Sequence, residues 1–171
     1  PDEMLSSALV SIKEKVSSDI FDQLICCHPS FFEKLVIDVL QAMGYGGGFE
    51  GSTEVTSYTQ DGGIDGIIKE DKLGLDTVYV QAKRQETNVG RPALQAFVGA
   101  MQGKGVRKGV FVTTSSFTNN AKEYVKTIES RLVLVDGKKL ADLMVDHNVG
   151  CSTAQTFHVK KLDTDYFDEM G

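Results

Sequence analysis

Residues 63–83 read GIDGIIKEDKLGLDTVYVQAK, and this stretch decides the fold. Its two ends, GIDGIIK and TVYVQAK, are rich in the isoleucine, valine and tyrosine that favour strands. The middle, EDKLGLD, supplies the aspartate and glycine residues that are typical of a tight turn. The stretch therefore predicts two strands, over residues 63–69 and 77–83, which a short turn pairs in antiparallel fashion.

The pattern predicts further elements on both sides of this pair. A strand over residues 53–58 comes before a turn-forming DGG sequence and completes an antiparallel meander. Upstream, apolar residues recur at helical spacing over 1–27 and again after Pro29, where Ser30 is the expected cap and Gly44 the expected stop. Downstream we expect helices over 92–101, 119–130 (capped by Thr118) and 138–146 (capped by Asp136), with strands over 108–114, 131–135 and, weakly, 156–160.

Length and element order together predict the fold class. The 171 residues correspond to roughly one domain of about 150 residues, and 17 glycines against 3 prolines fit a globular chain. A meander that gives way to alternating helices and strands implies an α/β fold, a single domain with a mixed central sheet flanked by helices. We divide the chain into an N-terminal helical segment (1–28), a main domain (29–150) and a C-terminal strand with an acidic tail (151–171).

Several classes of protein are excluded by composition. No apolar run approaches the roughly 18 residues that a membrane helix needs, and the N-terminus lacks the pattern of a signal peptide. The three cysteines, Cys26, Cys27 and Cys151, have no spacing that suits zinc or a disulfide framework. We therefore expect free thiols in a protein of the reducing cytoplasm, without a membrane segment.

Charge is unevenly spread along the chain. The net charge is −6, which by itself argues against a nucleic-acid partner. Residues 81–108, however, hold six basic residues and one acid, Glu86, so this stretch carries +5 and the rest carries −11. Because salt screens charges beyond about 8 to 10 Å, local charge decides phosphate binding. The basic stretch is a candidate nucleic-acid surface, although such stretches are more often plain solvated faces.

The chemistry-bearing residues lie in the stretch that decides the fold. Period-two alternation puts Gln81 and Lys83 on one face of their strand, and antiparallel pairing can bring Asp65 beside Gln81. Carboxylate and amide oxygens suit Mg²⁺, a hard cation that keeps several waters. Lys83 can orient an attacking water or stabilise charge on the phosphorus. One acid, one amide and one amine at a sheet edge therefore suit phosphodiester hydrolysis.

These residues resemble a known family. Asp65 followed by Gln81-Ala82-Lys83 is similar to the D…(D/E/Q)xK signature of PD-(D/E)xK nucleases. The blocks FFEKLVIDVLQAMGY, DGGIDG, VYVQAKR, LQAFVGAM and KGVFVTTSSFTNNA, in this order over about residues 31–146, resemble the catalytic domain of Mrr-type restriction endonucleases. The resemblance implies a restriction-endonuclease-like fold, with residues 29–150 as the catalytic domain.

The resemblance also implies an activity. It implies Mg²⁺-dependent cleavage, with Mn²⁺ as a substitute, of double-stranded and typically methylated DNA. The implied catalytic set is Asp65, Gln81 and Lys83, with Glu33 as a further acidic member. Asp65 and Gln81 are the implied metal ligands. Gln81 stands where the wider superfamily usually has an acid, which should weaken metal binding. The winged-helix DNA-binding domain common in the family has no room here, so we expect a catalytic fragment or a stand-alone catalytic form.

Further residues are candidates for DNA contact, each with a structural alternative. Arg84 and Arg91 lie in the basic stretch, which could be a plain solvated face. The resemblance implies that Gln95 faces the same general region, although a glutamine on a helix is usually just exposed. Thr113, Thr114 and Ser115 end a strand where hydroxyls and backbone N–H groups could bind a phosphate. The same three residues could form an ordinary capping turn. Glu33 follows Ser30 at the spacing of a capping box and could serve only the helix end.

Alternative functions remain open at this point. The chain could be another nuclease of the superfamily, such as a junction resolvase or a repair nuclease, which a panel of plain, methylated and branched DNA would distinguish. It could also be a non-catalytic DNA-binding or assembly module, for which DNA binding would be independent of Mg²⁺ and no nicking would occur. Cutting both strands of a duplex favours a homodimer or a transient dimer on DNA.

Overall fold

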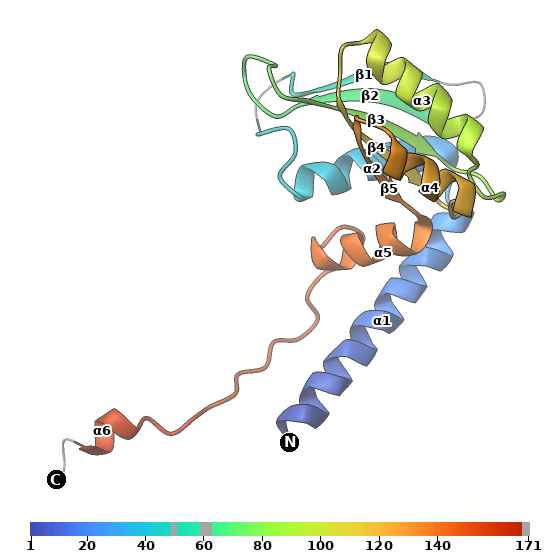
Figure 1. Ribbon diagram of the computed structural model, residues 1–171. Helices are drawn as coiled ribbons and strands as arrows, with labels where there is room; N and C mark the ends of the chain where they lie inside the picture. The colour runs from blue at the N-terminus through green and yellow to red at the C-terminus, as the bar shows by residue number, and fades with distance from the viewer. Residues whose placement is uncertain (49–50, 59–62, 169–171) are drawn as a thin grey trace.

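The computed structural model describes residues 1–48, 51–58 and 63–168, with the backbone alone for 54–58 and 63–65. Helices and strands follow each other in nearly the expected order (Figure 1). The elements are α1 (Asp2–Cys26), α2 (Pro29–Ala42), β1 (Thr53–Tyr58), β2 (Gly63–Lys69), β3 (Thr77–Lys83), α3 (Arg91–Gly103), β4 (Lys108–Thr113), α4 (Asn119–Thr127), β5 (Arg131–Val135), α5 (Gly137–Asp146) and α6 (Thr164–Asp168).

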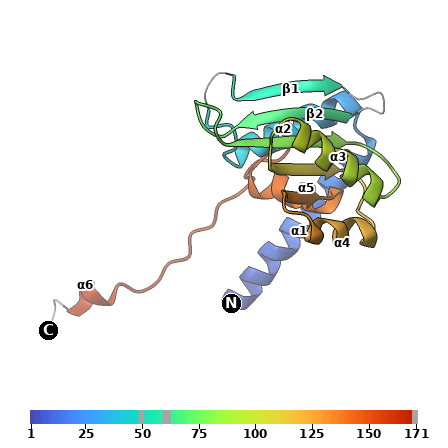
Figure 2. The same ribbon diagram turned by 45° about the horizontal axis from the view of Figure 1, so that its top comes forward.

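The five strands form one mixed sheet in the order β1-β2-β3-β4-β5. The first three pair in antiparallel fashion, and β3, β4 and β5 pair in parallel. The expected mixed sheet and its meander are therefore confirmed, and Figure 2 shows the strands as neighbouring arrows. Parallel pairing gives β3, β4 and β5 a common carboxyl edge, where α/β proteins usually place their ligands.

Helices cover both faces of the sheet (Figure 1). One face packs against α1, α2 and α5 in a core that includes Val78, Val80 and Ala82 of β3. The other packs against α3 and α4 in a second core that includes Tyr79 of the same strand. Because successive side chains of a strand point to opposite faces, the odd-numbered residues of β3 face α3. Two buried cores, one on each face, hold the central strands in place.

The start of α2 differs from expectation. The N-cap is His28, whose Nδ1 accepts a hydrogen bond from the backbone N–H of Ser30 at 3.2 Å. Ser30 as the cap was therefore wrong, because Pro29 already fits the first helical turn, where its missing N–H costs nothing. The capping-box interpretation of Glu33 fails with it, since Glu33 lies too deep in the helix to serve that cap. Gly44 does follow the helix end with a φ of +99°, as a stop should.

The C-terminal part of α1 belongs to the main core. Ile20 and Leu24 are buried in the same core as α2 and α5, and Figure 1 shows α1 running alongside α5. The approach is close at Gly137, where an added Cβ would lie 2.2 Å from the Thr114 carbonyl oxygen and 2.7 Å from a Phe21 ring carbon. Glycine at this position lets the first turn of α5 fit between α1 and the end of β4.

The C-terminal segment was predicted incorrectly. The weak strand expected over 156–160 is absent from the described residues 151–168, which carry only α6. Phe157 and Val159 are 65% and 72% exposed, so the alternating pattern has no neighbouring strand to pair with and no core to enter. Helix α4 also ends earlier than expected, at Thr127, because the chain must turn before it enters β5.

Two features considered from composition, membrane helices and cysteines, can be followed in the described residues. Among these residues, no helix is long and apolar enough to cross a bilayer. Cys26, Cys27 and Cys151 are all free thiols. Burial raises the pKa of the Cys27 thiol, whose Sγ donates a hydrogen bond to the Leu24 carbonyl oxygen.

Candidate functional site

The pairing register brings the predicted site residues together at one end of the sheet. Asp65 of β2 stands directly opposite Gln81 of β3, and Gly63 stands opposite Lys83. Residues that face each other across an antiparallel pair belong to the same face of the sheet. The Asp65 side chain lies outside the described part of the chain, so its place rests on backbone register. The expected neighbourhood of Asp65 and Gln81 is confirmed at that level.

Gln81 and Lys83 open onto a groove between β3 and α3. The groove has a volume of about 230 Å³, and both side chains are half-buried in its wall. Three alanines of α3 form the opposite wall: Ala93, Ala96 and Ala100. Spacings of three and four residues put these small side chains on one face of the helix. A groove remains because methyl groups stand where larger side chains would fill the gap.

Aromatic packing closes one end of the groove and fixes α3 on the sheet. The Tyr79 and Phe97 rings stack with centroids 5.2 Å apart, and Phe97 meets Phe111 edge to face at 5.4 Å. Such pairs stabilise by about 0.5 to 1.5 kcal/mol beyond burial. Tyr79, two residues before Gln81, thus holds β3 against α3.

The start of α2, the helix that carries Glu33, lies near the end of β3 on the other face of the sheet. The Arg84 guanidinium donates a hydrogen bond to the Ile25 carbonyl oxygen at 3.0 Å, which ties the end of β3 to the chain just before α2. Glu33 is buried, and burial raises the pKa of its carboxyl. Within the described residues it has no hydrogen-bond or ion-pair partner. Its membership of the site stays a prediction.

The basic stretch 81–108 is divided between the two ends of the sheet. Lys83, Arg84 and Arg91 lie near the carboxyl end of β3, whereas Lys104, Arg107 and Lys108 lie beyond the far end of α3. Lys108 is neutralised there, because hydrogen bonds and charge from Asp76 and Glu70 hold its ammonium and raise its pKa. Lys104 also reaches back toward the groove, because its ammonium lies 5.9 Å from the centre of the Tyr79 ring, which lines the groove. The basic residues of this stretch therefore do not all lie on one surface.

The other predicted DNA contacts differ in accessibility. Arg91 is exposed and lies over the Tyr124 ring at 5.1 Å, and Gln95 is exposed on α3. Thr113 is fully buried, with its hydroxyl 3.0 Å from that of Ser115. Thr114 exchanges two hydrogen bonds with the backbone of Gln85, which fastens the segment after β3 to the end of β4. Thr113 and Thr114 thus have clear structural roles.

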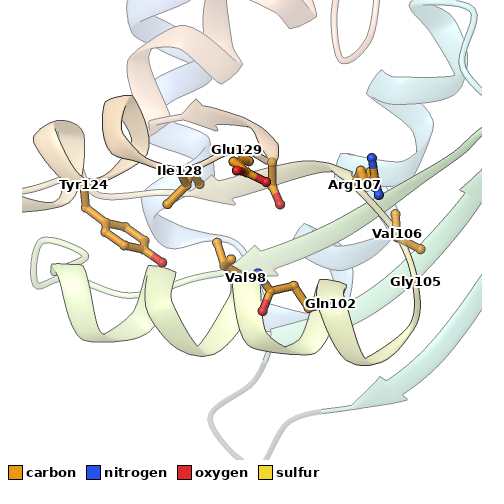
Figure 3. A pocket seen from close by; sticks show the side chains of 9 residues that line it. Val98, Gln102, Gly105, Val106, Arg107, Tyr124, Ile128 and Glu129 are labelled. Atoms are coloured by element: carbon orange, nitrogen blue, oxygen red, sulfur yellow. The ribbon is translucent and has the colours of Figure 1, made fainter.

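A larger cavity lies away from these residues. It occupies about 590 Å³ between α3 and α4, near the starts of β4 and β5 (Figure 3). Figure 3 shows Gln102 on α3 and Tyr124 on α4, with Arg107 and Glu129 at the rim. None of the predicted site residues lines it. Size alone therefore does not identify the site in this fold.

The donor set of the groove suits a hard divalent cation. The described side chains include no group of three or more histidine, cysteine, aspartate or glutamate residues able to hold a metal ion. The backbone register nevertheless pairs one carboxylate residue, Asp65, with one amide residue, Gln81. A single carboxylate with neutral oxygens and water is the kind of shell that Mg²⁺ accepts. The residues present therefore fit such an ion.

Sequence reasoning missed the alanine wall of the groove. Ala93, Ala96 and Ala100 looked like ordinary helix residues, although their spacing of three and four could have indicated a face kept free of bulk. It also missed Asn88 and Lys138, which line a second cavity together with Arg84. Lys138 is far from Arg84 and Asn88 in the sequence, so no local pattern connects the three.

Comparison with known proteins agrees with this geometry. A family model described as restriction endonuclease, for the Mrr catalytic domain, matches residues 26–144. The chain is 47% identical over 168 residues to the type IV methyl-directed restriction enzyme EcoKMrr of Escherichia coli strain K12. The alignment covers 98% of this chain and 54% of that enzyme. The chain thus spans about half the length of the curated relative it matches.

A solved structure supports the fold. The chain superposes on the DNA modification-dependent restriction endonuclease AspBHI with a TM-score of 0.59 and 18% identity, over 81% of this chain and 36% of that one. At this identity the likeness concerns the fold alone. The family match, by contrast, covers more than half of the chain and includes Asp65, Gln81 and Lys83. This chain belongs to the restriction endonuclease family of Mrr catalytic domains.

Proposed function

We propose that this chain is the catalytic module of a metal-dependent endonuclease that hydrolyses phosphodiester bonds of double-stranded, methylated DNA. The observation that carries the proposal is the register that sets Asp65 opposite Gln81, with Gln81 and Lys83 in one open groove. The relative from Escherichia coli is a type IV methyl-directed restriction enzyme, which supports the same reaction class and methylated DNA as substrate.

Each residue of the groove has a separate role in the proposal. Asp65 and Gln81 would hold a divalent ion, Mg²⁺ with Mn²⁺ as a substitute, through hard oxygen donors. When bound, the ion offsets phosphate charge and makes water a better nucleophile. Lys83 donates hydrogen bonds that orient the attacking water or stabilise charge on the phosphoryl oxygens. Glu33 is a further acidic candidate, and burial raises the pKa of its carboxyl.

DNA contacts outside the groove follow from its place at the sheet end. Arg84, Arg91 and Gln95 are the candidates that can approach a duplex bound there, with Ser115 beside them. Cutting both strands favours a homodimer or a transient dimer on DNA. Free thiols and the proposed DNA substrate suit a protein of the cytoplasm, as expected from composition.

A plasmid nicking assay tests the proposal. Supercoiled plasmid, methylated or unmethylated, is incubated with the protein in Mg²⁺ and in EDTA. We expect nicked and linear products only with Mg²⁺, and more from the methylated plasmid. Products that persist in EDTA would contradict a metal-dependent site. Preference for branched DNA would support a resolvase or repair nuclease, and DNA binding without any nicking would support a non-catalytic module.

A further inference from the structure

A second cavity lies at the carboxyl edge of the three parallel strands. It has a volume of about 650 Å³. Three of its lining residues each follow directly after a strand: Arg84 after β3, Thr114 after β4 and Asp136 after β5. Phe21, Ile25 and Cys26 of α1 form its apolar wall. This edge is the common position for ligands in sheets with parallel strands.

The cavity adjoins the candidate active site through adjacent residues. Lys83 lines the groove beside α3, and Arg84 lines the cavity beside α1. Neighbouring residues at a strand end direct their side chains to opposite sides. A basic side chain therefore stands on each side of the end of β3. Successive phosphates of one DNA strand follow each other about every 3.4 Å along the helix axis, so a strand that crosses the end of β3 presents more than one phosphate to these two side chains.

Two cations of the cavity lack acidic partners. Within the described residues, neither Arg84 nor Lys138 forms an ion pair. Other lysines of the described chain do pair with carboxylates, or lie over an aromatic ring. The Nε of Arg84 is the one buried side-chain nitrogen or oxygen in the described chain without a hydrogen-bond partner. A buried donor without a partner is unfavourable, so an acceptor that reached this guanidinium would be favoured.

One of the two acidic residues of the cavity is engaged in capping a helix. Asp136 directs Oδ1 to the backbone N–H of Lys139 at 2.8 Å, where it caps α5 and meets the positive end of that helix. Glu86 is exposed. Asn88 and Ser116 add polar groups to the wall and are joined by a hydrogen bond of 2.8 Å. The wall thus offers donors to an anion, with one acid already engaged.

We propose that this cavity binds a backbone phosphate of the DNA strand, next to the phosphate held at Lys83, through Arg84 and Lys138. The inference rests on the proposed function and extends it, since it assigns a second phosphate site on the opposite side of β3. Its role is to hold the strand in position while the groove acts on the neighbouring phosphate.

Lys138 and Lys139 provide a matched pair of variants. Both are exposed lysines in the first turn of α5, but only Lys138 lines the cavity. DNA binding is measured in EDTA at several salt concentrations with Lys138→Ala and Lys139→Ala. We expect Lys138→Ala to reduce the slope of log K against log salt by about 0.9, the value for one phosphate, and Lys139→Ala to leave it unchanged. Equal effects of the two variants would overturn the proposal.

A neutral phosphate analogue identifies the position. The cut made by the wild-type protein is mapped first, and a methylphosphonate is then placed at single positions around it. The double-mutant cycle compares DNA binding by the wild type and by Lys138→Ala, with and without the analogue. We expect Lys138→Ala to weaken binding at every analogue position except the one where the analogue replaces a phosphate adjacent to the cut. Arg84→Ala should behave alike, with circular dichroism to check α1, because Arg84 also bonds Ile25.

The outcomes separate this inference from the proposed function. If the wild type cleaves DNA but no analogue position couples to Lys138, the second phosphate site is refuted and the nuclease assignment stands. If the wild type neither binds nor cleaves DNA, both proposals are refuted. Coupling at one adjacent position supports the site.

Discussion

Asp65 and Gln81 stand opposite each other in the antiparallel pairing of β2 with β3, across a turn of a few residues. The acid and the amide therefore depend on one local register. A slip of one residue would move either to the other face of the sheet. The turn is held by Asp71, whose carboxylate accepts backbone N–H bonds from Asp76, Leu75 and Leu73, and these bonds lower its pKa.

The first prediction concerns the catalytic residues. Asp65→Ala and Lys83→Ala should each lower the rate of plasmid cleavage by at least about 10²-fold, because each removes charge aimed at the phosphate or the ion. Unfolding midpoints should change little. Lys72→Ala, at an exposed lysine of the β2–β3 turn, is the control and should cleave normally. Full activity of either site variant would remove this mechanism.

The second prediction concerns the neutral amide. Gln81→Glu should tighten Mg²⁺ binding, because a second carboxylate adds charge to the ligand set. Calorimetric titration measures the affinity. Gln102→Glu adds the same charge in the cavity between α3 and α4 and should have no such effect. Unchanged or weaker affinity of the Gln81 variant would reject Gln81 as a ligand.

The third prediction concerns access to the groove. Ala96→Leu should lower the cleavage rate by about 10²-fold, the effect of displacing a reacting group by about 1 Å, since the larger side chain fills the wall opposite Gln81 and Lys83. Mg²⁺ affinity should be retained. Gly99→Leu is the control, because a Cβ at Gly99 meets no heavy atom within 4 Å. Equal activity of the two variants would show that the substrate does not enter between β3 and α3.

The fourth prediction concerns pH and Glu33. Burial raises the pKa of this carboxyl in the folded state, so its contribution to stability is fully present below the unfolded value of about 4.3 and is lost as the pH rises through the folded value. Glu33→Gln removes this loss of stability, because the amide does not ionise. The variant should gain free energy of unfolding relative to the wild type as the pH rises from about 4 to 7.

Urea unfolding at several pH values measures that difference. Glu129→Gln makes the same substitution at an exposed carboxyl and is the control. If the difference in free energy of unfolding between Glu33→Gln and the wild type does not change with pH, burial does not shift the pKa of Glu33. A cleavage assay on the same variant tests its proposed place at the site.

The sequence by itself determined the order of the elements and the pairing of the central strands. GIDGIIK and TVYVQAK formed β2 and β3 with the expected bounds, because strand propensity, a turn and an alternating pattern all act over neighbouring residues. The same locality brought Asp65 beside Gln81. The caps at Thr118 and Asp136 were also confirmed, since each carries an oxygen that accepts a backbone N–H three residues later.

Tertiary structure decided everything that depends on distant parts of the chain. It divided the basic stretch between two ends of the sheet, because α3 separates Arg91 from Lys104. It placed Lys138 and Arg84 around one cavity, and it left residues 156–160 without a partner strand. Whether a residue is buried, and which distant residue it contacts, depends on which surfaces of the elements pack together. Local sequence patterns do not determine that packing.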